Sequence, residues 1–419
     1  MTDPVFGTRY RSWPAAEDST ATAIAARRHV SELMMPALTL QATALEHNAT
    51  VMADWVAGLG FDLAPHGKTS MSPELTARQL RHGAWAITAA TAGQARVFAG
   101  WGVPRIILAN EVTDPGSLCW VAETVAAGAV RLLVLVDSVP EVELLTAALA
   151  SAGAATPLDV LLEWGIPGGR AGVRDLGAAR EVAAAVAASA HVRLVGVECF
   201  EGVAGHDRSA ADEAAVGAMV ADLVTLLAEL AAVGGFAGLD EVILTAGGSS
   251  YPDLVAAAFA TVDNAAGIRV RKVLRSGGYI THDHGMLHRS SPMREDAHNP
   301  AGTLLPALRL YASVVSTPEP ALAIVGFGKR DAPFDIDLPI PLAVRRRGDL
   351  PAGPAVPLTD VSVLRCNDQH AFLHHDGELA VGDQVVFGIS HPCTAFDKWS
   401  LVPVLDDDER VVDLVTTQF

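Results

Sequence analysis

The sequence predicts an α/β protein in which a TIM (β/α)8 barrel precedes an antiparallel β domain. Eight short runs rich in β-forming residues alternate with alanine-rich helical stretches between residues 61 and 274. Beyond residue 293 the helical stretches give way to prolines, glycines and short alternating apolar runs. Eight strand–helix units suit the roughly 250 residues of a typical barrel, whereas a doubly wound sheet has about five or six strands.

The predicted elements of the barrel follow one another in strand-then-helix order. The eight strands are expected at residues 61–65, 85–89, 105–109, 130–136, 158–163, 192–198, 241–245 and 269–274. Helices between them include residues 44–59, 73–82, 114–127, 176–188, 210–233 and 251–261. Strands of the second unit are expected at residues 308–316, 322–325, 361–365 and 384–387, and residues 343–357, which contain three consecutive arginines, are expected to form an exposed loop.

These elements divide the chain into three segments. Residues 1–35 form an N-terminal segment expected to pack on the β domain, residues 36–292 form the barrel, and residues 293–419 form the β domain. With 419 residues, half of them hydrophobic, the chain is long enough to bury a large core.

Composition excludes several classes of partner. The formal net charge of -18 argues against nucleic acid and anionic membrane, because phosphate groups would repel most of this surface. The four cysteines are scattered without paired spacing, which favours a reducing compartment. We find no leader peptide pattern and no uninterrupted apolar span, so we expect a soluble cytoplasmic protein that acts on a small molecule.

Polar residues and glycines follow most of the predicted strands. Because a barrel enzyme builds its active site from the loops after the strands, these residues are expected to meet at one face. Gly247-Gly248-Ser249 and Gly277-Gly278 follow the seventh and eighth strands, where barrel enzymes commonly hold a phosphate on backbone N–H groups. Either loop alone is more often a simple turn, but the two together favour a phosphate site.

Lys68 ends the first strand in the motif Pro65-His66-Gly67-Lys68-Thr69. Most lysines lie on the surface, but burial at a barrel mouth would favour the neutral amine that a Schiff base requires. A lysine opposite two phosphate loops suggests an aldehyde cofactor that carries a phosphate, namely pyridoxal 5'-phosphate (PLP).

His391 and Cys393 form a second candidate constellation, near the end of the β domain. Two such side chains separated by a single residue in an extended segment point to the same side and suit a borderline-soft ion such as zinc. Pairs of this kind are usually incidental, and water, substrate or another loop would have to complete the site.

The lysine motif and the His-x-Cys pair together resemble the D-serine dehydratase and D-threonine aldolase family of PLP enzymes with the alanine-racemase fold. Residues 30–405 carry the resemblance, which includes Trp164-Gly165-Ile166-Pro167-Gly168-Gly169-Arg170. It implies a homodimer with sites near the subunit interface, Lys68 as Schiff-base lysine and α-proton base, and a metal on His391 and Cys393, with His391 also catalytic. It also implies cofactor contacts from His66, Arg170, Gly247, Gly248, Ser249, Gly277, Gly278 and Tyr279.

The chain departs from relatives at two places. Phe200 stands where relatives often have an aromatic hydroxyl, and Ser70-Met71 replaces a His-Lys continuation of the lysine motif. His206, after the sixth strand, is open between a structural role and contact with the substrate.

The resemblance favours a zinc-dependent D-serine dehydratase, which eliminates the β-hydroxyl of a D-3-hydroxy amino acid to give a 2-oxo acid and ammonia. A D-threonine aldolase, which could use manganese, is the nearest alternative, although such relatives tend to have His-x-Asp where Cys393 stands here. A racemase would need a second base, for which Tyr279 is the candidate, and a non-catalytic PLP carrier would leave the metal pair unexplained.

Overall fold

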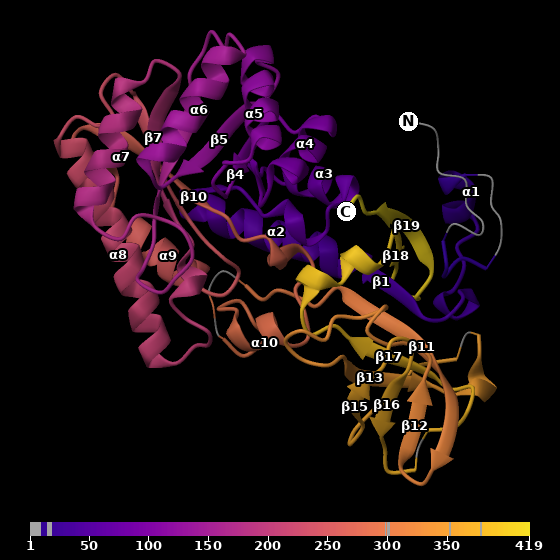
Figure 1. Cartoon of the computed structure of the whole chain (residues 1–419). Coiled ribbons are helices and arrows are strands. Elements are labelled where there is room, and N and C mark those ends of the chain that lie inside the picture. Colours follow the sequence, from indigo (N-terminus) through magenta and orange to yellow (C-terminus); the bar gives the residue numbers. More distant parts are fainter. Residues whose placement is uncertain (1–9, 15–18, 298, 300–301, 352, 378) are drawn as a thin grey trace.

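The computed structural model describes residues 10–14, 19–297, 299, 302–351, 353–377 and 379–419. Two units lie side by side, a barrel made of the chain from indigo through magenta to the beginning of the orange, and a β domain made mostly of its orange-to-yellow part (Figure 1). The predicted fold class is therefore confirmed.

Eight parallel strands form the barrel. Their spatial order is β2-β10-β8-β7-β6-β5-β4-β3, with the short β9 (Asn264–Ala265) attached to β10. Backbone hydrogen bonds from Trp85 N to Leu63 O (2.7 Å) and from Thr88 N to Pro65 O (2.8 Å) join the two ends and close the barrel. The strands are β2 (Asp62–Leu63), β3 (Ile87–Ala89), β4 (Arg105–Leu108), β5 (Arg131–Val136), β6 (Leu158–Trp164), β7 (Val192–Cys199), β8 (Glu241–Ala246) and β10 (Ile268–Leu274).

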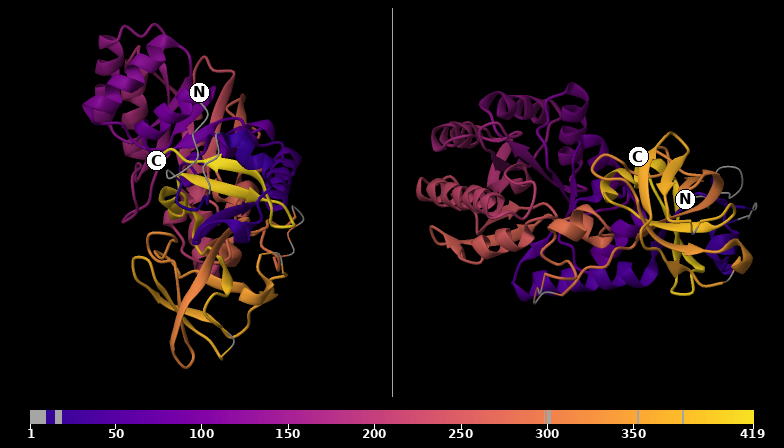
Figure 2. Two further views of the ribbon diagram at one scale, coloured as in Figure 1. Left: turned by 90° about the vertical axis from the view of Figure 1, so that its right-hand side faces the viewer. Right: turned by 90° about the horizontal axis from the view of Figure 1, so that it is seen from below.

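Helices cover the outside of the barrel (Figure 2). Polar N-cap side chains start several of them: Ser72, Thr91, Asp114, Asp175 and Ser209 each accept a hydrogen bond from a backbone N–H of the first turn. The helices are α2 (Ala42–Gly58), α3 (Pro73–Arg81), α4 (Ala92–Gly100), α5 (Pro115–Ala127), α6 (Val139–Ser151), α7 (Leu176–Ala188), α8 (Ala210–Ala232) and α9 (Pro252–Phe259). The short α10 (Met286–Ser290) follows the barrel.

Helix α8 is long and apolar enough, by length and composition, to cross a membrane. Its apolar face instead packs into the core of the barrel, where Leu223, Leu226 and Leu230 are fully buried. We interpret it as a core helix, and the cytoplasmic location stays a prediction.

The barrel interior changes from apolar to polar toward the ends of the strands. Small and aliphatic side chains, among them Leu161 and Ile243, fill the lower interior. Because side chains alternate along a strand, the residues two positions later also point inward. Those residues are Glu163 and Thr245, and Glu198 lies between them in register on β7. A row of polar groups therefore lies directly beneath the barrel mouth.

The second unit is built on a mixed sheet. Its main order is β14-β13-β17-β11-β1-β18-β19, and β12, β15 and β16 extend it from β11. The strands are β1 (Ala37–Gln41), β11 (Leu308–Glu319), β12 (Leu322–Val325), β13 (Ile340–Arg345), β14 (Val356–Pro357), β15 (Ser362–Cys366), β16 (Ala371–His374), β17 (Gln384–Gly388), β18 (Leu401–Leu405) and β19 (Val411–Thr416). Strand β1 lies within the segment predicted as barrel, yet it pairs with β11 and β18.

The described part of the N-terminal segment packs against this sheet. Tyr10 and Trp13 are buried in one cluster with Leu401 and Val411, and α1 (Thr20–Ala25) adds Ala23. Residues 1–9 and 15–18 of the predicted segment lie outside the described residues.

The expectation of a fully exposed arginine-rich loop at 343–357 was wrong at its first arginine. Arg345 ends β13 and is 1% exposed. Its guanidinium donates to Gln384 Oε1 (2.7 Å) and forms an ion pair with Glu409, which satisfies the charge inside the domain.

Candidate functional site

Lys68 lies on a tight turn immediately after β2. Residues Gly67–Thr69 form a single 3-10 turn, and a Cβ at Gly67 would approach Phe98 Cζ to 2.7 Å, so the turn requires glycine there. The Lys68 side chain is exposed at the edge of a pocket, so the expected burial of this lysine was wrong. The lysine is thus accessible at the barrel mouth.

The pocket beside Lys68 has a volume of about 300 Å³. It brings together residues from both ends of the chain, and seven of them are predicted site residues: His66, Lys68, Gly248, Ser249, Gly277, Gly278 and Cys393. Residues that the sequence analysis did not assign to the site complete the wall: Thr69, Glu201, Gly202, Gly205, Ser250, Tyr251, Met286 and Ser290, with Phe200 and His206.

The two glycine-rich loops lie next to each other at one side of this pocket. Ser276 Oγ donates to Gly248 O (2.7 Å), and Gly278 N donates to Ser249 Oγ (3.1 Å), so hydrogen bonds tie the loops together. Gly247 has a φ of +138°, a conformation that favours glycine, and a Cβ at this position would lie 2.9 Å from Arg275 N. We call this pair of loops the glycine cradle, and its residues Gly248, Ser249, Gly277 and Gly278 line the pocket.

His66 packs directly against the cradle. A Cβ at Gly277 would lie 2.5 Å from His66 O, so the lysine strand and the cradle touch through backbone. Burial, followed by the charges of Arg275, Lys68 and Arg170, lowers the pKa of His66 well below its ordinary value. Its ring is therefore neutral at pH 7, and its buried Nδ1 has no protein partner in the part of the chain described.

Glu201 is a buried acid that the sequence analysis did not assign to the site. Its Oε1 accepts a hydrogen bond from Gly248 N (2.7 Å), while its Oε2 is buried without a partner in the described structure. Burial raises the pKa of Glu201 against the opposing effect of that hydrogen bond. The Glu201 side chain thus holds the Gly248 loop from the residues that follow β7. In the sequence, only its position after a predicted strand could have suggested a role at the site.

The polar row below the mouth contains two buried acids, Glu163 and Glu198, each beside an arginine. Arg275 donates to Glu198 and to Cys199 O (2.5 Å), and both charged side chains are almost fully buried. Burial and the neighbouring charge of Glu198 raise the pKa of Glu163 to about 10. Burial also raises the pKa of Glu198, and the charge of Arg275 opposes that rise.

Cys393 lies at the same pocket as Lys68, and His391 comes two residues before it in the chain. Cys393 lines the pocket, and its Sγ is 3.6 Å from Thr69 Oγ1, the residue after the lysine. Burial lowers the pKa of His391, but the hydrogen bond and charge of Cys393, together with those of Asp335, raise it to about 9. The pKa of Cys393 is lowered, because His391, Thr69 and Lys68 outweigh the effect of burial.

A metal that displaced the protons of this pair would find an imidazole nitrogen and a sulfur, a donor set that fits zinc. No cluster of three or more His, Cys, Asp or Glu side chains suited to a metal occurs among the described residues. A metal on this pair would therefore take its remaining ligands from water or substrate, which leaves it open for chemistry.

Three predicted cofactor residues, Gly247, Tyr279 and Arg170, do not line the pocket. Tyr279 is buried behind the cradle, where burial raises its pKa and Gln79 is its hydrogen-bond partner. Tyr251 lines the pocket instead, with its hydroxyl donating to Asp207 O (2.5 Å). Arg170 is about half exposed, with its guanidinium 4.9 Å above the Phe200 ring, so it flanks the pocket from outside.

Comparison with known proteins agrees with this geometry. The family model "Putative serine dehydratase domain" matches residues 307–405. The chain is 28% identical to 3-hydroxy-D-aspartate aldolase of Paracoccus denitrificans (strain Pd 1222), over 85% of this chain and 84% of that protein. The chain is thus similar to proteins of the D-serine dehydratase and D-threonine aldolase family.

Solved structures of members of this family share the fold. D-threonine aldolase from Filomicrobium marinum aligns with a TM-score of 0.74 at 24% identity, over 92% of this chain and 96% of its own. D-threo-3-hydroxyaspartate dehydratase from Delftia sp. HT23 aligns with a TM-score of 0.72 at 20% identity, over 93% and 99%. A variant of D-threo-3-hydroxyaspartate dehydratase with one cysteine replaced by alanine is described as a metal-free form.

Alanine racemase of Clostridium difficile 630 aligns more distantly, with a TM-score of 0.60 at 13% identity over 92% of this chain and 99% of its own, which confirms the alanine-racemase fold. The aldolases and dehydratases of the family are lyases, so the predicted enzyme class is also confirmed. PLP is the cofactor expected for the family.

Proposed function

We propose that this chain is a PLP- and zinc-dependent dehydratase that converts a D-3-hydroxy amino acid into a 2-oxo acid and ammonia. The similar proteins with known activities are lyases that act on D-hydroxy amino acids, which supports this broader class of reaction. The observation that carries the proposal is the presence of Lys68 and Cys393 on one pocket, with Thr69 in contact with the cysteine.

The pocket fits PLP in three respects. Its volume of about 300 Å³ is of the size that small cofactors occupy. Gly248, Gly277 and Gly278 of the glycine cradle line it, and so does Lys68. When bound, PLP would withdraw electrons from the amino acid and make its α-hydrogen acidic.

Each residue then has a distinct task. Lys68 Nζ would hold the cofactor and afterwards take the proton from Cα, because it is the accessible amine on the pocket. The neutral imidazole of His66 would contact the cofactor from the pocket wall. The cradle, with Ser249, would fix the phosphate end, while Glu201 keeps the cradle in place.

A zinc ion on His391 and Cys393 would supply a Lewis acid for the β-hydroxyl. An acid catalyst is needed there because hydroxide is a poor leaving group. Cys393 favours zinc over the harder manganese ion, and this favours elimination over aldol cleavage.

An aldolase is the second candidate, because the relative from Paracoccus is named an aldolase. A racemase is less favoured, because the only second base that we considered, Tyr279, is buried behind the cradle. We also propose that the protein is a homodimer, as the family resemblance implies, which light scattering of the purified protein would test.

Product analysis separates these functions. The PLP-loaded protein is incubated with D-serine, D-threonine and D-threo-3-hydroxyaspartate, with and without EDTA. We expect ammonia and a 2-oxo acid that disappear with EDTA. Glycine and an aldehyde would identify an aldolase, an L-enantiomer would identify a racemase, and no turnover of any D-amino acid would overturn the proposal.

A further inference from the structure

Asp335 lies beside the metal pair, on the segment between β12 and β13. Its Oδ2 is 2.7 Å from His391 Nδ1, and its Oδ1 accepts from Thr394 Oγ1 at 3.0 Å. Since His391 and Thr394 flank Cys393, one carboxylate holds both sides of the turn that carries the cysteine. No sequence motif links residues 56 positions apart in this way.

We propose that Asp335 is the positioning residue that orients His391 for metal binding, an inference that rests on the proposed function. An imidazole that donates Nδ1–H to a carboxylate presents the lone pair of Nε2 to a metal. Such carboxylates fix the tautomer and ring orientation of metal-binding histidines and raise their basicity. The structure therefore assigns Nε2 of His391 as the metal ligand.

The alternative that Asp335 is itself a metal ligand fits the contacts less well. Both of its oxygens are already engaged, one by His391 and the other by Thr394. Binding a metal directly would break at least one of these hydrogen bonds and free the histidine ring to rotate.

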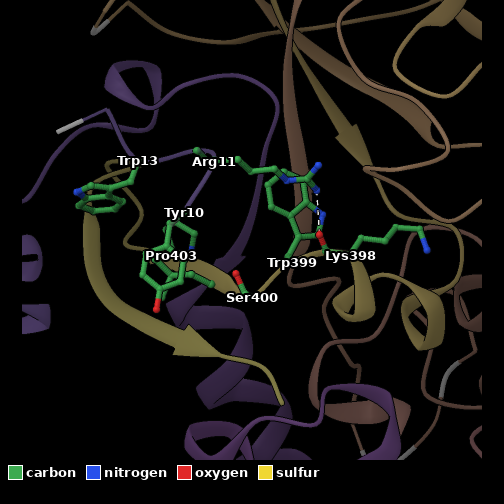
Figure 3. A pocket seen from close by; sticks show the side chains of 9 residues that line it. Tyr10, Arg11, Trp13, Lys398, Trp399, Ser400 and Pro403 are labelled. Atoms are coloured by element: carbon green, nitrogen blue, oxygen red, sulfur yellow. Dashed lines mark hydrogen bonds between the residues drawn. The ribbon is translucent and has the colours of Figure 1, made fainter. Parts of the chain in front are cut away.

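The segment that carries Asp335 is anchored four residues earlier, at Asp331. Buried Asp331 accepts hydrogen bonds from Gly328 N (2.9 Å), Gln369 Nε2 (3.0 Å) and Arg11 Nη1 (2.8 Å). Figure 3 shows Arg11 extending over Trp399, with 3.9 Å between its guanidinium carbon and the ring centroid. Arg11 Nη2 also donates to Lys398 O (2.9 Å), shown by the dashed line.

Lys398 connects this anchor to the metal turn itself, because its Nζ donates to Thr394 O (2.7 Å). Asp335 and the turn with His391 are thus fixed to a common support. Asp335 is itself 42% exposed. We therefore expect its effect on metal affinity to exceed its effect on the stability of the fold.

Asp337 provides a matched control on the same segment. Its side chain is 43% exposed, and it pairs with Arg289. Substitution there removes an equally exposed carboxylate two residues away without removing a contact to His391.

The test measures the zinc affinity of the PLP-loaded full-length protein by competition with a chromophoric chelator. We expect Asp335→Ala to weaken zinc binding by about 10- to 100-fold. Asp335→Asn retains an acceptor for Nδ1–H and should recover part of that loss, while Asp337→Asn should bind zinc as the wild type does.

Wild-type zinc affinity in Asp335→Ala, or equal losses in Asp335→Ala and Asp337→Asn, would overturn the positioning role alone. Wild-type protein that binds no zinc, or a Cys393→Ala variant with unchanged affinity, would overturn the proposed metal pair as well. The two failures are therefore distinguishable in one set of titrations.

Discussion

Replacing Gly277 with alanine tests the contact between the glycine cradle and the lysine strand. The added Cβ would lie 2.5 Å from His66 O, 2.7 Å from His66 Cβ and 2.9 Å from His66 N. No change of side-chain rotamer relieves these overlaps, so the two segments must move apart. Overpacking of this kind costs about 1–3 kcal/mol in the free energy of unfolding.

The same displacement should weaken PLP binding. Lys68 is two residues from His66, so a shift of this strand end changes the spacing between the amine and the cradle. We expect a lower urea midpoint for Gly277→Ala by tryptophan fluorescence, and weaker binding in a PLP titration followed by absorbance.

Gly217 supplies the control with the opposite sign. It lies within α8, and a Cβ there would meet nothing within 4 Å. Gly217→Ala should stabilise the protein by about 0.5–1 kcal/mol, because alanine favours the helix, and leave PLP affinity unchanged. A Gly277→Ala protein with wild-type stability and wild-type PLP affinity would refute the contact.

Three further substitutions test other parts of the site and the barrel. Arg275→Met should lower the free energy of unfolding by about 3–5 kcal/mol, because Glu198 loses its buried partner. Thermal melting should show that the double variant Arg275→Met/Glu198→Leu recovers stability. A double variant no more stable than Arg275→Met would argue against the pair. Burial raises the pKa of Glu141 from 4.5 to about 8, so the folded state holds a proton that the unfolded state releases, and stability should fall as pH rises from 4.5 to 8. Glu141→Gln should remove this part of the pH dependence in urea melts, and identical slopes in both proteins would contradict the assignment. His391→Ala should lose zinc affinity and product formation but keep PLP binding by absorbance, and a parallel loss of PLP would show that the histidine has a different role.

The barrel and its cradle could be predicted because their signals are local. Each strand has its own apolar run, and parallel strands deliver the following loops to one face, so Lys68, Gly248 and Gly278 meet without any long-range information. Strand β1 could not be assigned this way. It is followed at once by α2, as a barrel strand would be, and only its pairing with β11 and β18 places it in the other sheet.

Side-chain direction and contacts between irregular segments were also beyond sequence. Tyr279 lies in the 3-10 turn Gly278–Ile280, which turns its ring behind the cradle, whereas Tyr251 opens α9 and faces the pocket. Asp335 reaches His391 from a segment without regular structure, so no periodicity or spacing could reveal the contact.

In the proposed function, Lys68 acts at Cα while a metal on His391 and Cys393 acts at the β-hydroxyl. Exchange of the α-hydrogen of D-serine in D2O tests this division most directly, measured by NMR alongside 2-oxo acid formation. After EDTA treatment we predict that exchange continues while product formation stops, and that Lys68→Ala abolishes both. Loss of exchange together with product after EDTA, or product formation that EDTA leaves unchanged, would contradict the account.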